Sequence, residues 1–318
     1  MVRAGLAPFV SGATVTHVEV LDERSLRRHP GPAEDFIERL TGAVLASPSR
    51  RGKYLWLPLV PSTPAPRTNL KENRLESATN GMFWSSAVDS PSNSFTRATG
   101  EALVVHLGMS GQVLLREPGT DDALTRVRID LEHPEHGPLR LNFVDQRIFG
   151  SMAIDGLVAA HDVAEERLPA SVAHIARDPL DPHFDDARFF AALRKRRTGV
   201  KRALLDQTLV SGIGNIYADE ALWAARIHYG QPTDALSRPR ATVLLAEVRA
   251  VLAKALDEGG TSFDAQYRNV NGESGYFSHS LNAYGQQGRP CPRCGRPIVR
   301  EQFMNRGSHY CPRCQRIR

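Results

Sequence analysis

The chain has 318 residues, 41% of them apolar and 24% charged, with a formal net charge of +5 at pH 7 and a pI near 9.2. This length and composition can bury a sizeable core, and we expect two domains followed by a small ribbon. No stretch approaches the roughly 18 uninterrupted apolar residues of a membrane helix, and the start shows no apolar signal segment. The composition is therefore not that of a membrane protein, and the basic balance is compatible with a nucleic-acid partner.

The first half of the chain alternates apolar and polar residues with a period of two, which predicts an antiparallel β domain over residues 1–165. Residues 2–10 are expected to form a short helix that is broken by Pro8, and residues 32–40 a short amphipathic helix with Pro32 in its first turn. The basic stretch 49–53 is interpreted as a turn between two paired strands. The expected strands are 13–21, 44–47, 54–60, 102–107, 112–115, 126–131, 139–144 and 150–154.

Two segments of this half differ from the strands around them. Residues 61–99 are rich in Ser, Thr, Asn and Pro, and we interpret them as a long disordered insertion between two strands. The turn 145–150 places Arg147 and Phe149 two residues apart, so we expect their side chains to point to the same side.

From about residue 185 the apolar period becomes helical, with helices expected at 185–197, 202–210, 216–228 and 238–257. Between the second and third helices, the sequence 210–220 places Gly212 and Gly214 in a turn ahead of Asn215. Glycines let a phosphate approach the backbone, and a helix N-terminus favours an anion. The turn is therefore either a phosphate clamp or an ordinary helix–helix corner. The long Gly-rich and polar segment 259–279 is interpreted as a lid.

The last thirty residues contain all four cysteines of the chain, as Cys291-Pro-Arg-Cys294 and Cys311-Pro-Arg-Cys314. Two such knuckles can close a tetrahedral shell of thiolates around one structural Zn²⁺. Two disulfides are the alternative, but disulfide frameworks are usually small, secreted and cysteine-dense. Short strands are expected at 298–299 and 302–303, and residues 305–310 are interpreted as the hairpin turn.

Residues 289–318 hold eight arginines and one acid, Glu301, for a formal charge of +7. Four thiolates on Zn²⁺ would lower this to about +5. Such a ribbon suits a polyanion.

A β domain, a glycine-turned helical pair and a basic four-cysteine ribbon together resemble the formamidopyrimidine-DNA glycosylase family, which includes endonuclease VIII relatives. The resemblance covers nearly the whole chain. It is carried by Arg51-Gly-Lys53, His106-Leu-Gly-Met-Ser-Gly111, Asp145-x-Arg147-x-Phe149-Gly150, Gly212-x-Gly-Asn-Ile-Tyr-Ala-Asp-Glu220, Tyr284-Gly285 and Arg306 ahead of Tyr310-Cys311.

The resemblance implies an α+β multi-domain fold: an N-terminal antiparallel β-sandwich domain at 1–165, a helix-two-turns-helix domain at 180–285 and a zinc ribbon at 286–318. It also implies a monomeric enzyme of the bacterial cytoplasm that is associated with the nucleoid through DNA. Enzymes of this family flip an oxidised base out of double-stranded DNA, cut its glycosidic bond and nick the strand at the abasic site.

The resemblance gives each matched residue a role. Lys53 and Arg306 correspond to catalytic-site residues that contact phosphate, with Lys53 also donating a proton during elimination. Met109, Arg147 and Phe149 correspond to the residues that fill the gap left by the flipped nucleotide. The remaining implied DNA contacts are Lys201, Gly214, Asn215 and Tyr284.

The chain departs from the family pattern at two places. The family begins with Pro-Glu after the initiator methionine, and neither residue is present here. We therefore expect the chain as written to bind abasic DNA without excising a base, and suspect a mis-assigned start. Leu124 stands where a histidine that touches DNA is expected.

Three interpretations of function stay open. The first is a glycosylase and lyase for oxidised purines (8-oxoguanine, formamidopyrimidines), which Met109 and Arg147-x-Phe149 favour. The second is a non-catalytic binder of damaged DNA, and the third is an enzyme of the pyrimidine-preferring branch.

Overall fold

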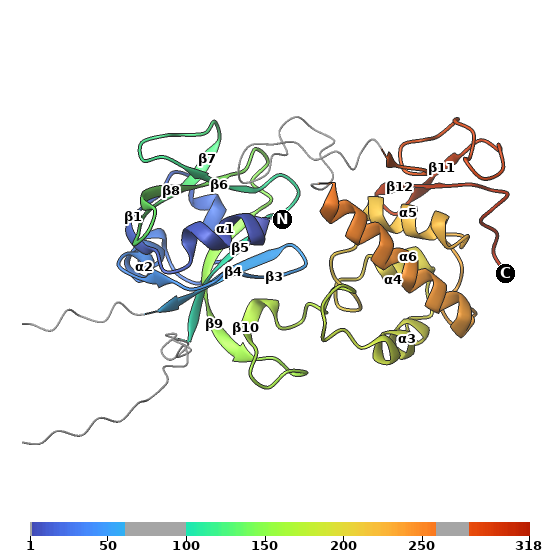
Figure 1. The fold of residues 1–318 in the computed structure, drawn as a ribbon, viewed down its shortest axis with the longest axis horizontal. Helices are drawn as coiled ribbons and strands as arrows, with labels where there is room; N and C mark the ends of the chain where they lie inside the picture. The colour runs from blue at the N-terminus through green and yellow to red at the C-terminus, as the bar shows by residue number, and fades with distance from the viewer. Residues whose placement is uncertain (1, 61–99, 259–279) are drawn as a thin grey trace, which may run out of the picture.

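The computed structural model describes residues 2–60, 100–258 and 280–318. It contains a β-rich N-terminal body and a helical C-terminal body that carries the ribbon (Figure 1). The predicted insertion at 61–99 and the predicted lid at 259–279 lie outside the described residues. Within the described ranges, no helix is long and apolar enough to cross a membrane.

The N-terminal body is built on one antiparallel sheet in the order β10-β9-β5-β4-β2-β1-β7-β8-β6, with β3 pairing to β4. The two-residue strand β2 joins the two halves, because it pairs with β1 on one side and β4 on the other. The strands are β1 (Thr14–Val20), β2 (Val44–Leu45), β3 (Ser49–Arg51), β4 (Tyr54–Val60), β5 (Glu101–His106), β6 (Gln112–Arg116), β7 (Thr125–His133), β8 (Gly137–Val144), β9 (Ser151–Ala159) and β10 (Arg167–Pro169).

The two halves of the sheet share one apolar core, so the body is a sandwich as predicted. Alternate residues of β4 and β5 meet alternate residues of β7 and β8 in this core, as the period of two requires. Helices α1 (Val2–Val10) and α2 (Ala33–Leu40) add buried side chains to it, including Leu6 and Phe36. The 3-10 turn η1 (Glu23–Leu26) lies between β1 and α2 in the chain.

The C-terminal body consists of α3 (Asp186–Lys195), α4 (Val200–Leu204), α5 (Asn215–Ala224) and α6 (Arg238–Asp257) around a second apolar core. The Asp185 side chain accepts a hydrogen bond from the backbone N–H of Arg188 and caps α3. The ribbon (286–318) is built on the hairpin of β11 (Val299–Phe303) and β12 (Arg306–Tyr310), with β12 packed along α5.

The connection between the two bodies is fixed by a buried arginine. Arg177 donates to Asp162 and Asp181 at 2.7 and 2.8 Å and also to Glu166, which in turn pairs with Arg51 at 2.7 Å. These carboxylates raise the pKa of Arg177 despite the opposing effect of burial. Breaking such a network is costly, so it ties β3 and the β9–β10 loop to the segment that leads into α3.

The structure corrects four local predictions. Residues 49–51 are strand β3, so the turn is only Gly52-Lys53; α4 spans 200–204 and not 202–210. Helix α1 runs through Pro8 to Val10, because burial of Leu6 and Val10 outweighs the lost hydrogen bond. The ribbon turn is Met304-Asn305, and residues 306–310 form β12.

Candidate nucleic-acid interface

The four cysteines converge at the base of the ribbon. Their Sγ atoms lie within 4.8 Å of one another, and none forms a disulfide. Cys294 Sγ and Cys311 Sγ are 3.5 Å apart, far from the roughly 2.05 Å of a disulfide and close to the about 3.8 Å expected between two thiolates of a tetrahedral zinc site. The donor set therefore fits Zn²⁺.

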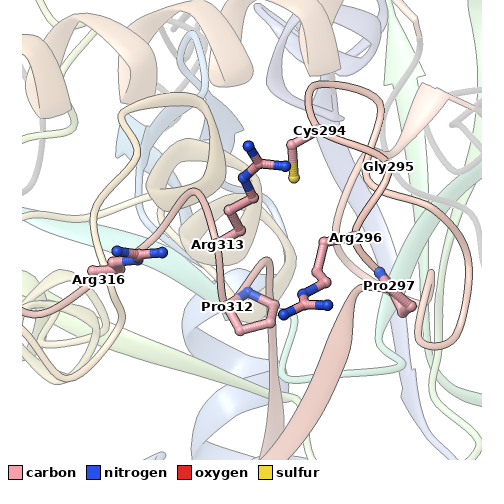
Figure 2. Close-up of a pocket in the computed structure, with 7 residues that line it drawn as sticks. All are labelled: Cys294, Gly295, Arg296, Pro297, Pro312, Arg313 and Arg316. Atoms are coloured by element: carbon pink, nitrogen blue, oxygen red, sulfur yellow. The ribbon is translucent and has the colours of Figure 1, made fainter.

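The two knuckles use their central arginines differently. Arg293 donates to the backbone carbonyls of Trp223 and Ala224 at 2.5 and 2.9 Å, and its guanidinium lies 3.9 Å from the centre of the Trp223 ring. Arg313 occupies the same place in the second knuckle but lines a recess of ≈ 560 Å³ with Arg296 and Arg316 (Figure 2). Within the described residues these three guanidiniums form no hydrogen bond or ion pair, so this face of the ribbon is strongly basic.

Met109, Arg147 and Phe149 come from two loops that are tied together by Asp145. The Asp145 carboxylate accepts from Ser110 Oγ at 2.5 Å, from Arg147 N at 3.2 Å and from Gly150 N at 2.6 Å. Phe149 keeps 46% of its surface exposed and Met109 40%. Both apolar side chains are therefore open to a partner.

Two further features hold these loops. Arg27 donates to the backbone carbonyls of Ile148 and Phe149, the second at 2.5 Å. A Cβ on Gly108 would lie 2.6 Å from the Phe149 carbonyl carbon, and Gly108 also has a φ of +60°, so only glycine fits there. The two loops therefore form one rigid platform that presents the three predicted side chains.

Lys53 and Arg306 come from opposite bodies, and the Arg306 guanidinium is near enough to act on the Lys53 amine. The pKa of the Lys53 amine is lowered, first because surrounding protein displaces part of its water and then because the Arg306 guanidinium adds a like charge. Arg306 Nη2 lies 3.8 Å from Met109 Sδ. The first residue of β12 therefore meets the loop platform, although the two are almost 200 residues apart in sequence.

A recess of ≈ 350 Å³ lies beside Arg306 at the N-terminus of α5. The unshared N–H groups of the first turn and the helix dipole favour an anion there. The Asn215 side-chain amide donates one hydrogen bond to the Gly307 carbonyl at 3.2 Å. The recess is lined by Asn215, Tyr284, Gly285, Gln287, Arg300, Arg306, Gly307 and His309.

Glu220 fixes the segment that follows the predicted lid. Its carboxylate accepts from the backbone N–H groups of Asn282, Ala283 and Tyr284 at 2.8–2.9 Å, and from the Asn282 side chain at 3.3 Å. The Tyr284 ring packs edge-on against the His309 ring at 4.7 Å. Tyr284 is thereby brought to the recess, and its contact with DNA stays a prediction.

Lys201, for which the resemblance implies a DNA contact, lies in the interior of this structure. Its side chain has no exposed area, and its Nζ is 2.6 Å from Asp219 Oδ1. Burial lowers the pKa of the amine, and Asp219 opposes that shift.

Gly214 precedes α5 as its N-cap. Leu124 is 46% exposed with a φ of +66°, and nothing in the structure explains its departure from the expected histidine.

Sequence reasoning missed Arg27, Asp219, Glu220 and Arg293 as residues that build this surface. A signal was present for two of them: Asp219 and Glu220 follow each other inside an apolar helix. Two adjacent buried carboxylates need donors from elsewhere in the chain.

Comparisons with models of known protein families identify the class of protein. Residues 1–152 match the model of the formamidopyrimidine-DNA glycosylase N-terminal domain, residues 175–266 that of the formamidopyrimidine-DNA glycosylase H2TH domain, and residues 288–317 that of a zinc finger found in FPG and IleRS. Together the three matches cover the β body, the helical body and the ribbon.

Individual relatives and solved structures point to the same family. The chain is 58% identical to formamidopyrimidine-DNA glycosylase of Leifsonia xyli, over all of this chain and 97% of that protein, and 49% identical to that of Salinispora arenicola, over 99% and 93%. Among solved structures it is similar to MutM (FPG) from Thermus thermophilus (31% identity, TM-score 0.71, 99% and 96% covered) and to Lactococcus lactis Fpg with abasic DNA (25%, 0.72, 99% and 97%). The chain belongs to the formamidopyrimidine-DNA glycosylase family.

Proposed function

We propose that the protein is a base-excision repair glycosylase with abasic-site lyase activity that acts on oxidised purines in double-stranded DNA. The observation that carries this proposal is the meeting of the loop platform with Lys53 and Arg306. Exposed apolar and cationic probes can enter the base stack only if nearby cations hold the phosphates of the same DNA. Relatives named as formamidopyrimidine-DNA glycosylases, and a structural neighbour bound to abasic DNA, support the same function.

Each matched residue takes its role from this arrangement. Lys53, Asn215 and Arg306 contact phosphates, with Gly214 and Tyr284 shaping the recess beside them. Lys53 is also the proton donor in elimination, which the lowered pKa of its amine supports. Met109, Arg147 and Phe149 refill the stack and probe the orphaned base. The same three side chains favour oxidised purines over the substrates of the pyrimidine-preferring branch.

One zinc ion has a structural role in this proposal. Cys291, Cys294, Cys311 and Cys314 would complete its shell and leave no open position for a substrate. When bound, Zn²⁺ cross-links the two knuckles, and the ribbon has too little apolar core to fold well without it.

The proposed organisation keeps the predicted domains: 1–165, 180–285 and 286–318. Two separate apolar cores in the β body and the helical body support the first division. We propose a monomer that works on chromosomal DNA in the bacterial cytoplasm. Damage-specific binding without cutting is the alternative, because it would use the same surface.

Borohydride trapping tests the proposal. DNA carrying 8-oxoguanine opposite cytosine is incubated with the 318-residue chain and with the same chain extended upstream so that it begins with Pro-Glu at the family's distance from α1, so that the result does not depend on the start of the sequence. A matched duplex carrying an oxidised pyrimidine is the control substrate. A trapped adduct and a nick on the 8-oxoguanine duplex support the proposal. Tight binding to abasic DNA with no adduct from either chain overturns it in favour of a binding module.

A further inference from the structure

The buried amine of Lys201 lies directly behind the ribbon hairpin. Its Nζ is 3.2 Å from the Gly307 carbonyl oxygen, which also accepts from Asn215 Nδ2 at 3.2 Å. The same amine lies 4.9 Å from the centre of the Phe303 ring, so it touches both strands of the hairpin. Gly307 is the residue after Arg306, and its position therefore fixes where the Arg306 side chain begins.

Asp219 holds the next two residues of β12. Its carboxylate accepts from Ser308 Oγ at 3.1 Å, from His309 N at 2.9 Å and from His309 Nδ1 at 3.3 Å. Ser308 is fully buried, and a Cβ on Gly307 would lie 2.5 Å from Arg300 Nε. The backbone after Arg306 is thus held on one side by polar contacts and on the other by close packing.

We propose that Lys201 and Asp219 are positioning residues for Arg306: together they fix the β11–β12 hairpin on α4 and α5 so that the Arg306 guanidinium reaches a DNA phosphate. This inference rests on the proposed function, because it takes Arg306 as a phosphate contact. It assigns Asp219 a part in DNA binding and moves Lys201 from direct contact to support.

The chemistry of the pair explains why a lysine is buried here. The Asp219 carboxylate has 1% exposed side chain and needs a positive partner. An ammonium group supplies that charge and still has a proton left to donate to the Gly307 carbonyl. For Lys201 to bind phosphate itself, the hairpin would have to leave α5 and both contacts would have to break.

A double-mutant cycle on DNA affinity tests the proposal. Lys201→Met and Arg306→Ala are measured singly and together, at several salt concentrations, on a duplex with an abasic-site analogue. Arg306→Ala should weaken binding by about 5- to 150-fold and lower the salt slope by about one. Lys201→Met should weaken binding about 5-fold or more alone but less than about 2-fold in the Arg306→Ala background, with no further fall in slope.

Controls separate positioning from a loss of charge or of folding. Lys195→Met removes an exposed lysine of the same body and should leave affinity within about 2-fold. Circular dichroism and zinc content are recorded for every variant. Ser308→Ala, which removes only one hydroxyl bonded to Asp219, repeats the cycle with a smaller perturbation should Lys201→Met fail to fold.

The outcomes are distinct. Losses that multiply, with a total fall in slope of about two, would mean that Lys201 contacts phosphate and would overturn this inference alone. A Lys201→Met variant that is folded and binds normally overturns it as well. An Arg306→Ala variant with unchanged affinity removes the phosphate contact on which both proposals rest, whereas failure of borohydride trapping affects only the proposed function.

Discussion

Replacing Arg293 by alanine should destabilise the ribbon, whereas the same change at Arg313 should not. Helix α5 ends at Ala224, so the carbonyls of Trp223 and Ala224 lie in its last turn, where the Trp223 carbonyl also accepts from the backbone N–H of Arg226 at 3.2 Å. Arg293 donates to both carbonyls and makes a cation–π contact with Trp223. Its positive charge also complements the negative end of the helix dipole.

The magnitude follows from these contacts. A charge-assisted hydrogen bond contributes about 1.5–3 kcal/mol when buried, and a cation–π contact about 0.5–1 kcal/mol at an exposed site. Because Arg293 is itself exposed, we take the lower end and expect Arg293→Ala to cost about 2 kcal/mol. Arg313→Ala should stay within about 0.5 kcal/mol, as surface substitutions usually do.

Urea unfolding of the zinc-loaded protein, followed by tryptophan fluorescence, measures both variants. The pair is matched: each change removes one arginine from the centre of a Cys-Pro-Arg-Cys knuckle, so the loss of charge beside the thiolates is common to both. Equal losses for the two variants, or a loss below about 0.5 kcal/mol for Arg293→Ala, would refute the reasoning.

Three further predictions concern the β body and the metal. Phe149→Ala should impair flipping of a damaged base more than nonspecific binding, by stopped-flow fluorescence of a base analogue; equal losses on damaged and undamaged DNA would make Phe149 a packing residue. The pKa of His106 is lowered to about 4 by burial and by Arg28 and Lys53. Protonation of His106 therefore opposes folding. The free energy of unfolding should be highest above about pH 6.5 and fall by up to about 3 kcal/mol towards pH 4. Unfolding measured as a function of pH should show a weaker pH dependence for His106→Asn. Cys311→Ser should lose zinc by elemental analysis and lose DNA binding; a folded, metal-free ribbon that still binds DNA would contradict the zinc assignment.

The strands with strict alternation were predictable from sequence, because the signal lies in the residues themselves. The strand expected at 126–131 lies within β7 at 125–133, where buried residues alternate with less buried ones, and the sandwich follows from such strands. Strands β3 and β12 were wrongly predicted as turns. Arg50 and Arg51 look like a solvated turn, and Gly307-Ser308 is typical of one, but both segments are strands because each pairs across a two-residue turn with the neighbouring strand, β4 or β11.

The candidate site was predictable as far as its chemistry is local. Four cysteines at knuckle spacing specify a metal site by themselves, and the structure confirms that the four side chains converge. The burial of Lys201 could not be foreseen, because it depends on Asp219 in the next helix and on a hairpin much further along the chain. A lysine carries the same side chain in both settings, and only tertiary packing decides whether it meets water or a carboxylate.

The ten-residue helix α5 has consequences for how this chain can diverge in evolution. Asp219 serves the hairpin, Glu220 serves residues 282–284, Trp223 receives the knuckle arginine, and Leu222 belongs to the helical core. Nearly every side of the helix is thus committed to a different neighbour. Substitutions here should be tolerated only with compensating changes in two or three distant segments, so α5 should accumulate replacements more slowly than the longer, simpler α6.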